Sequence, residues 1–240
     1  MENVKTEWVP VLNHGGIRIV SYMQPAEPDP NWTGDFEVVR NARTSYAGES
    51  KTGKSLTADA KLINYLVENW HTSPLESMVF TFEVKAPIFV FRQWHRHRTW
   101  AYSELSGRYQ ELPEEYYIPE VSQITHQSVD NKQQRTDELH PEADLIQDLI
   151  MNSCMESFKV YHQLLALKPP CPRELARTVL PLATYSHMFG TVNLLNLLKY
   201  CKLRIHGHAQ YEIRVYAEQM LKMVETVCPQ VILAAQRHWL

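Results

Sequence analysis

The sequence predicts a helix-rich α/β protein with a small sheet. Three observations lead to this class. Helical periodicity extends over several long segments, whereas the alternation of apolar and polar residues that marks a strand covers only short ones. With 240 residues, 44% of them hydrophobic and 21% charged, the chain has the composition of a globular protein with a sizeable core. No run approaches the roughly 20 apolar residues of a membrane-spanning helix. We therefore expect one domain over residues 1–240.

Two strands and six helices are predicted. The strands are expected at residues 17–22 and 78–84, the second of which ends near Pro87, because proline disrupts strand pairing. Thr57 can serve as the N-cap of the second helix, whose apolar residues fall on one face. Residues 121–140 are polar with weak periodicity and are expected to be variable surface. The helices are expected at residues 36–42, 56–70, 142–167, 172–183, 191–203 and 209–227.

Charge and cysteine content indicate a cytoplasmic protein. The formal net charge of -3 gives no sign of a nucleic-acid or acidic-membrane partner. The first ten residues contain acidic side chains and no apolar run, unlike a signal peptide. The four cysteines are widely spaced without a CxxC pair, which in a chain of this size indicates reduced thiols.

Residues 48–55 match the GxxxxGK[ST] phosphate-loop pattern. Such a loop functions only between a buried strand and a helix, where backbone N–H groups surround the phosphates. Residues 40–46 do not have the pattern of a buried strand, and no apolar run ending in a metal-binding Asp follows. A solvated loop before the next helix is favoured, and a nucleotide kinase remains an alternative.

Two further patterns suggest catalytic chemistry. Cys171 lies between two prolines, but an activated thiol needs a base or a helix N-terminus, and no partner His is identifiable, which favours a structural cysteine. The His-x-His pairs at 95–97 and 206–208 could bind a metal. In the first pair, His97 lies between Arg96 and Arg98, whose positive charges disfavour a bound cation. No metal is therefore expected.

The strongest candidate site is the segment 92–109. It contains four arginines and two histidines, and its only acid is Glu104. Arginine side chains suit phosphates and planar carbonyl groups, and Trp and Tyr faces suit flat rings. The segment therefore indicates a site for a phosphorylated heteroaromatic ligand. Single-stranded nucleic acid is the alternative, against which the acidic balance weighs.

The same segment resembles the signature of flavin-dependent thymidylate synthases, RHRxxSxNExSxRY. Further elements resemble the family at 40–45, 71–76, 172–181, 191–193 and 203–213, so that the resemblance spans roughly residues 36 to 230. The positions that agree in and just before the signature are Gln93, Arg96, His97, Arg98, Glu104, Ser106, Arg108 and Tyr109.

The resemblance implies an α/β (α+β) fold with a small, mostly antiparallel sheet flanked by several long helices. It also implies a homotetramer whose active sites lie between subunits, with FAD stacked against dUMP. NADPH reduces FAD, methylenetetrahydrofolate passes its methylene group to C5 of uracil, and the flavin hydride completes the methyl group, with no cysteine nucleophile. A relative that acts on another pyrimidine nucleotide, or leaves a hydroxymethyl group, is the near alternative.

The resemblance also assigns roles to individual residues. His71 and Tyr109 are expected on the folate side, and catalysis is expected from Ser106, Arg108 and Arg204. A guanidinium near the uracil carbonyls can stabilise the negative charge that develops on the ring. The residues expected to bind FAD are Ser73, Glu76, Arg96, His97, Arg98, Asn193, Lys199 and His208. Those expected to bind dUMP are Gln93, Glu104, Ser106, Arg108, Arg177 and Arg204.

Five positions depart from the family pattern. Ala101 stands where the signature has Ser, Ser103 where it often has Asn, and Ser77 where some members have His. Leu195 occupies a position where an Arg commonly contacts FAD, and Lys199 one where an Asn is expected. Compensation of the lost Arg by the Lys one helical turn later is favoured over weaker FAD binding or an altered product.

Overall fold

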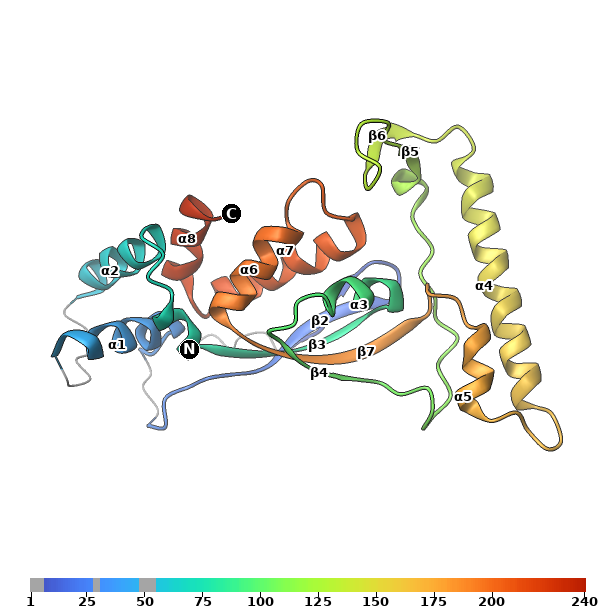
Figure 1. The fold of residues 1–240 in the computed structure, drawn as a ribbon, viewed down its shortest axis with the longest axis horizontal. Helices are drawn as coiled ribbons and strands as arrows, with labels where there is room; N and C mark the ends of the chain where they lie inside the picture. Colours follow the sequence, from blue (N-terminus) through green and yellow to red (C-terminus); the bar gives the residue numbers. More distant parts are fainter. Residues whose placement is uncertain (1–6, 28–30, 48–54) are drawn as a thin grey trace.

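The computed structural model describes residues 7–27, 31–47 and 55–240. Its central feature is a five-stranded antiparallel sheet with the order β1-β2-β3-β7-β4, while β5 and β6 form a separate hairpin (Figure 1). The predicted α/β (α+β) class with a mostly antiparallel sheet is confirmed. The strands are β1 (Val9–Val11), β2 (Gly15–Tyr22), β3 (Val79–Pro87), β4 (Ala101–Glu104), β5 (Thr125–Gln127), β6 (Arg135–Leu139) and β7 (Tyr185–Asn193).

Helices gather on one face of this sheet and at its two ends (Figure 1). Covering the face are α3 (Ile88–Trp94), α6 (Leu194–Arg204) and α7 (Tyr211–Glu225). At one end lie α1 (Gly34–Ala47), α2 (Leu56–Glu68) and α8 (Pro229–His238). At the other end the long α4 (Ala143–Leu165) lies beside the short α5 (Arg173–Ala176).

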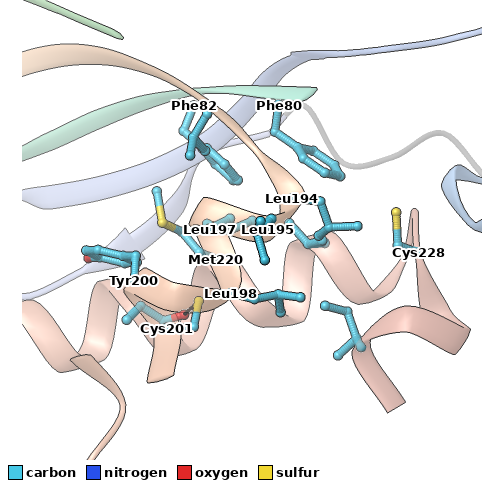
Figure 2. Packing of buried hydrophobic residues seen from close by; sticks show 14 of the residues in the cluster. Phe80, Phe82, Leu194, Leu195, Leu197, Leu198, Tyr200, Cys201, Met220 and Cys228 are labelled. Carbon is cyan, nitrogen blue, oxygen red and sulfur yellow. Dashed lines mark hydrogen bonds between the residues drawn. The ribbon is translucent and has the colours of Figure 1, made fainter. Parts of the chain in front are cut away.

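The main core forms between the sheet and α6. Phe80 and Phe82 of β3 point toward the leucines of α6, and Met220 of α7 closes the layer (Figure 2). Successive side chains of β3 point to opposite faces of the sheet, so these aromatic side chains are buried while Thr81 points to the other face. There the Thr81 hydroxyl lies 2.9 Å from the hydroxyl of Thr191 on β7, within hydrogen-bond distance. Each fully buried Leu or Phe stabilises the fold by about 1.5–3 kcal/mol, which fixes α6 on the sheet.

Side-chain caps determine where two helices begin. The N-cap of α2 is Ser55, whose hydroxyl accepts from the N–H of Ala58 at 3.2 Å, so the expectation of Thr57 was wrong by two residues. The rest of the phosphate-loop pattern, residues 48–54, lies outside the described residues. At α8, the buried Asp35 carboxylate accepts from the N–H groups of Gln230 and Val231. Burial nevertheless raises the pKa of Asp35 to about 6.

Several predicted boundaries were wrong. Residues 191–193 end strand β7 and do not begin a helix, because they pair with the start of β3. The helix expected at 172–183 is only α5 followed by a 3-10 turn at Arg177–Val179, and Pro181 follows that turn. Helices α3 and α8 were not expected, nor was the hairpin within residues 121–140. In the part of the chain that the structure describes, no helix is both long and apolar enough to span a membrane.

Candidate functional site

The Arg96–His97–Arg98 segment lies in the turn that connects α3 to β4. Helix α3 begins directly after Pro87, and its buried Trp94 holds it against the core. The hydroxyl of Tyr102 then donates to two carbonyl oxygens of the turn, that of Trp94 at 2.9 Å and that of His97 at 2.8 Å. The signature turn is therefore held in place from both of its ends.

Arg204, His97 and Gln93 form a polar cluster between α3 and the end of α6. The Nε of Arg204 donates to Nε2 of His97 at 3.0 Å, and its terminal nitrogens reach the side-chain and backbone oxygens of Gln93 at 3.4 and 3.2 Å. Burial, and then the charge of Arg204, lower the pKa of His97 to about 4. His97 is thus neutral at pH 7, and its Nε2 accepts while Nδ1 carries the hydrogen.

Arg96 and Arg98 on either side of His97 are exposed. Among the residues that the structure describes, neither guanidinium has a carboxylate within ion-pair distance. Both guanidinium groups therefore leave their donors available to a ligand. Phosphate oxygens match this donor set well.

A second polar group lies where the end of β4 approaches α5. Glu104 accepts a hydrogen bond from the hydroxyl of Ser186 at 3.0 Å. Beyond it, Arg108 pairs with Glu174 of α5 at 3.2 Å, and the hydroxyl of Ser106 accepts from the N–H of Arg108 at 3.3 Å. Arg177 lies against the same segment, since a Cβ built on Gly107 would be only 3.3 Å from its Cδ.

The two groups make separate sets of contacts in the described part of the chain, and His95 at the end of α3 lies between them, with its Nε2 3.9 Å from Oε2 of Glu104. The first lies among α3, α6 and the loop that follows α6, whereas the second lies between the end of β4 and α5. Within residues 7–27, 31–47 and 55–240, no hydrogen bond or ion pair connects them directly. The residues expected to bind dUMP therefore come together as two sets, with Gln93 and Arg204 in one and Ser106, Arg108 and Arg177 in the other.

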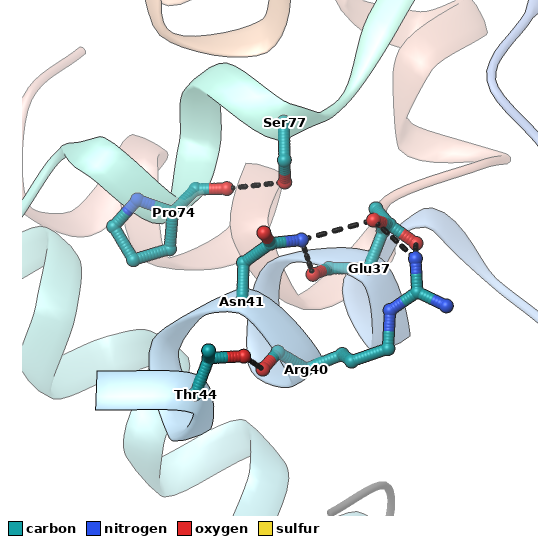
Figure 3. Close-up of polar contacts among 6 residues, drawn as sticks. All are labelled: Glu37, Arg40, Asn41, Thr44, Pro74 and Ser77. Atoms are coloured by element: carbon teal, nitrogen blue, oxygen red, sulfur yellow. Dashed lines mark hydrogen bonds and ion pairs between the residues drawn. The ribbon is translucent and has the colours of Figure 1, made fainter. Parts of the chain in front are cut away.

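Two of the residues expected to bind FAD, Ser73 and Glu76, lie on the 3-10 turn η1 (Ser73–Ser77), which packs against α1 and α6. Ser73 and Glu76 are exposed on this turn, and so is the adjacent His71. Figure 3 shows the polar contacts that order the region: Glu37 of α1 accepts from Arg40 and Asn41, and the hydroxyl of Ser77 donates to the carbonyl of Pro74.

Asn193 and His208 approach from α6 and its following loop. The Oδ1 of Asn193 caps α6 by accepting from the N–H of Asn196 at 2.9 Å. The Nδ1 of His208 lies 2.7 Å from Oε1 of Gln134, on the β5–β6 hairpin. The hairpin and this loop surround a cavity of about 500 Å³. Sequence reasoning missed Gln134 because nothing local to residues 121–140 indicates which loop they contact.

The departures from the family pattern are located in different environments. Leu195 is 3% exposed and belongs to the core beneath β3, so it contacts no ligand from there (Figure 2). Lys199, one turn later on α6, is exposed. Ala101 and Ser103 are exposed on β4, opposite Thr191 and Phe189 of β7.

The two other catalytic patterns remain without supporting geometry. Cys171 is partly buried beside the small cluster of Phe158 and Tyr161, and its Sγ lies 3.8 Å from the carbonyl of Pro172. Tyr109, which is one of the two residues expected on the folate side, is 84% exposed. Within the described ranges, no group of three or more His, Cys, Asp or Glu side chains is placed to hold a metal ion.

Comparison with known proteins identifies similar chains over nearly the whole length. The family model described as thymidylate synthase complementing protein matches residues 30–230. A flavin-dependent thymidylate synthase of Treponema denticola is 43% identical over 229 residues, covering 95% of this chain and 81% of the relative. One of Thermosipho melanesiensis is 40% identical over 221 residues, covering 91% and 89%.

Among solved structures, a UMP/dUMP methylase, PolB from Streptomyces cacaoi bound with 5-Br dUMP, has a TM-score of 0.83 and 28% sequence identity to this chain. The match covers 96% of this chain and 98% of that one. The similarity therefore includes the sheet, both end regions and the segments that carry the two polar groups.

Proposed function

This chain belongs to the thymidylate synthase complementing protein family, and from that premise we propose how its residues carry out flavin-dependent thymidylate synthesis. The enzyme methylates dUMP to dTMP, with methylenetetrahydrofolate as carbon donor and NADPH as the source of reducing equivalents. FAD, reduced by NADPH, supplies the hydride that completes the methyl group. The observation that supports the site best is the Arg204–His97–Gln93 cluster within the matched signature.

The first polar group suits the uracil ring. Arg204 is held on one side by His97 and Gln93, so its guanidinium keeps one orientation before substrate arrives. A pre-oriented guanidinium beside a uracil carbonyl stabilises negative charge on the ring, the enolate-like form from which C5 can attack the one-carbon donor. Because His97 is neutral, it accepts the Arg204 hydrogen bond without competing for the same anionic substrate.

The second polar group suits the phosphate of dUMP. Arg108 and Arg177 are exposed cations beside the Ser106 hydroxyl, and guanidinium and hydroxyl donors are the usual partners of a phosphate. The single partner of Arg108 within the described chain, Glu174, is itself exposed, so a dianionic phosphate can displace it.

The donor set around the signature turn fits FAD. Arg96 and Arg98 offer unpaired guanidinium groups to a diphosphate, and Asn193 offers its Nδ2 group, since only its Oδ1 is used in capping. Ser73, Glu76, Lys199 and His208 supply further polar groups from η1, α6 and the loop after α6. His71 and Tyr109 are proposed to face the folate.

We propose that the complete site forms between subunits of a homotetramer, because the two dUMP groups of one chain are separate. Exposed apolar side chains on the outer side of α4, Leu145, Leu149 and Met155, provide surface for assembly. We further propose that residues 1–240 form one domain and that the enzyme acts in the cytoplasm. Light scattering should give a mass about four times the 28.0 kDa of the chain.

Subunit complementation tests the shared site directly. Arg204→Ala and Arg177→Ala are each expected to lower activity at least about tenfold when dUMP is kept well below its KM. If these two residues meet across an interface, co-expression of the two variants gives some sites in which both arginines are intact. With random mixing about one site in four is intact, so activity returns to roughly a quarter of wild type. If one chain supplies both, every site carries a lesion and no activity returns.

The reaction itself is tested by an absorption spectrum and by product mass. The purified protein should bind FAD, lose the flavin absorbance on addition of NADPH with dUMP, and release tritium from C5 of dUMP once the folate is present. A protein that cannot be loaded with FAD contradicts the proposal. A nucleotide kinase instead predicts that Lys54→Ala abolishes activity, and a single-strand binder predicts steeply salt-dependent oligonucleotide binding.

UMP is a second candidate substrate, because the similar solved structure is that of a UMP/dUMP methylase. Incubation with dUMP, UMP and dCMP in turn, followed by mass determination, separates the choices. A gain of one methyl group on dUMP alone is expected for a thymidylate synthase. Equal methylation of UMP would show that the substrate range includes UMP. A mass gain of one hydroxymethyl group would show that the product is a hydroxymethyl nucleotide.

A further inference from the structure

The β5–β6 hairpin lies against the loop between α6 and α7, far in sequence from the signature turn (Figure 1). Together they line the cavity of about 500 Å³, which is open on one side and is lined mainly by amide and hydroxyl groups. His208 and Gln210 contribute to this lining from the loop, and Arg135 and Arg214 add positive charge. Gln210 also contacts Gln93 through its side-chain amide, which connects the cavity to the first polar group.

A buried carboxylate holds the hairpin in place. Arg135 donates to both oxygens of Glu212, at 3.0 and 3.1 Å, and to the carbonyl of Gln123 at 3.0 Å. Glu212, at the start of α7, is 3% exposed and also accepts from the hydroxyl of Tyr117 at 3.0 Å. A buried carboxylate without partners is strongly destabilising, so this contact keeps the hairpin on α7.

Gln134, next to Arg135, is fixed in both backbone and side chain. Its backbone oxygen accepts from the N–H of Ser128 and from the side chain of Gln127, both at 3.0 Å. Its Oε1 accepts from Nδ2 of Asn131 at 3.3 Å and lies 2.7 Å from Nδ1 of His208. Since an oxygen accepts both contacts, Nδ1 of His208 carries the hydrogen, and Nε2 is left as an acceptor on the opposite side of the ring.

We propose that the hairpin is a wall of the flavin site and that Gln134 is a positioning residue for His208. Gln134 holds His208 in its Nδ1–H tautomer, so that Nε2 accepts a hydrogen bond from a donor of FAD, such as a ribityl hydroxyl. The hydroxyl and amide lining of the adjoining cavity suits the same polar chain of the cofactor. This inference rests on the proposed function, in which His208 binds FAD.

FAD affinity, measured by fluorescence titration of the apoenzyme, tests the hydrogen bond. Gln134→Met keeps the length of the side chain but removes the acceptor, and it should raise the Kd for FAD about tenfold, the factor that one ordinary hydrogen bond corresponds to. Gln134→Glu keeps an acceptor at the same place and should stay within about threefold of wild type. Gln236→Met, the same exchange on the exposed surface of α8, should change nothing.

The tautomer of His208 provides a readout that does not depend on FAD. In ¹⁵N spectra of histidine-labelled apoenzyme, with His208→Ala used for assignment, wild type should show the Nδ1–H form. In Gln134→Met the Nε2–H form should appear. A wild-type pattern in that variant overturns the inference, as does a loss of affinity in Gln134→Glu equal to that in Gln134→Met.

His208→Ala separates this inference from the proposed function. If His208→Ala raises the Kd for FAD while Gln134→Met binds FAD as wild type does, the inference fails and the function stands. If His208→Ala binds FAD normally, the cofactor role assigned to His208 fails as well. Non-additive effects of His208→Ala and Gln134→Met in a double-mutant cycle support the inference.

Discussion

The two polar groups expected to bind dUMP differ in how completely one chain builds them. Arg204 lies half-buried between α3 and α6, with His97 and Gln93 holding its guanidinium. Arg108 is 59% exposed, and its one ion pair is with an exposed Glu on α5. The difference teaches that the core holds the first group in one orientation, whereas the second is open. Under the proposed function, the open group is completed by the phosphate of the ligand and by a neighbouring subunit.

The largest effect is expected from removing the pre-organised guanidinium. Arg204→Ala should lower kcat about 100- to 1000-fold, because a fixed donor at the developing charge is lost. The matched control is Arg237→Ala, an exposed arginine on α8, which should leave kcat unchanged. Steady-state assays with dUMP measure both variants, and a loss confined to KM would place Arg204 away from the reacting ring.

A smaller effect is expected in the open group. Arg177→Ala should lower kcat/KM for dUMP about 10- to 100-fold, mainly through KM, because one charge-assisted hydrogen bond to phosphate disappears. The variant should also lose preference for dUMP over deoxyuridine, which has no phosphate. Preference equal to that of wild type would assign Arg177 to another role.

The neutral His97 predicts a pH dependence of stability. Its pKa is about 4 in the folded chain, against a reference value of 6.5. The unfolded chain therefore binds a proton near pH 6.5 and the folded chain only near pH 4, so the stability from His97 is lost as pH falls between these values. With solvent screening the loss should be about 1–2 kcal/mol. Asp35 has the opposite effect, because its pKa is raised to about 6 in the folded chain and protonation of this carboxyl stabilises the folded state as pH falls. It therefore partly offsets the loss of stability from His97.

Urea unfolding of the apoenzyme at pH 7 and pH 4.5 measures this contribution. His97→Gln removes the titrating group and should lose less stability on acidification than wild type does. Asp35→Asn removes the opposing group and should lose more. Identical pH dependence in wild type and His97→Gln would contradict a half-buried, neutral His97.

The smallest effect is expected at Lys199, which lies on the same helix as Arg204 but on its exposed surface. If Lys199 replaces the charge that Leu195 does not supply, Lys199→Ala should raise the Kd for FAD about threefold to fivefold, a surface-charge effect. Lys222→Ala, an exposed lysine on α7, is the control. Fluorescence titration measures both, and equal affinities would show that Lys199 compensates for nothing.

The local pattern predicted some elements well and others poorly. Residues 142–167 form an amphipathic helix long enough to be recognised alone, and α4 confirms it. Strand β7 was missed because it is buried between β3 and β4 and contains Gly190 and Asn193, so its alternation is weak. Helix α8 was missed because its start depends on Asp35, which lies almost 200 residues earlier in the chain.

The residues of this chain by themselves identified its family and predicted the chemistry of the site. A dense run of arginines after an apolar strand, with the spacing of the signature, is a local property that needs no fold to be recognised. Only the tertiary structure decided that Arg204 reaches His97, that Leu195 lies in the core, and that Gln134 contacts His208. Such contacts join segments more than seventy residues apart, and side-chain pairing across that separation depends on how helices and strands pack, which local periodicity does not encode.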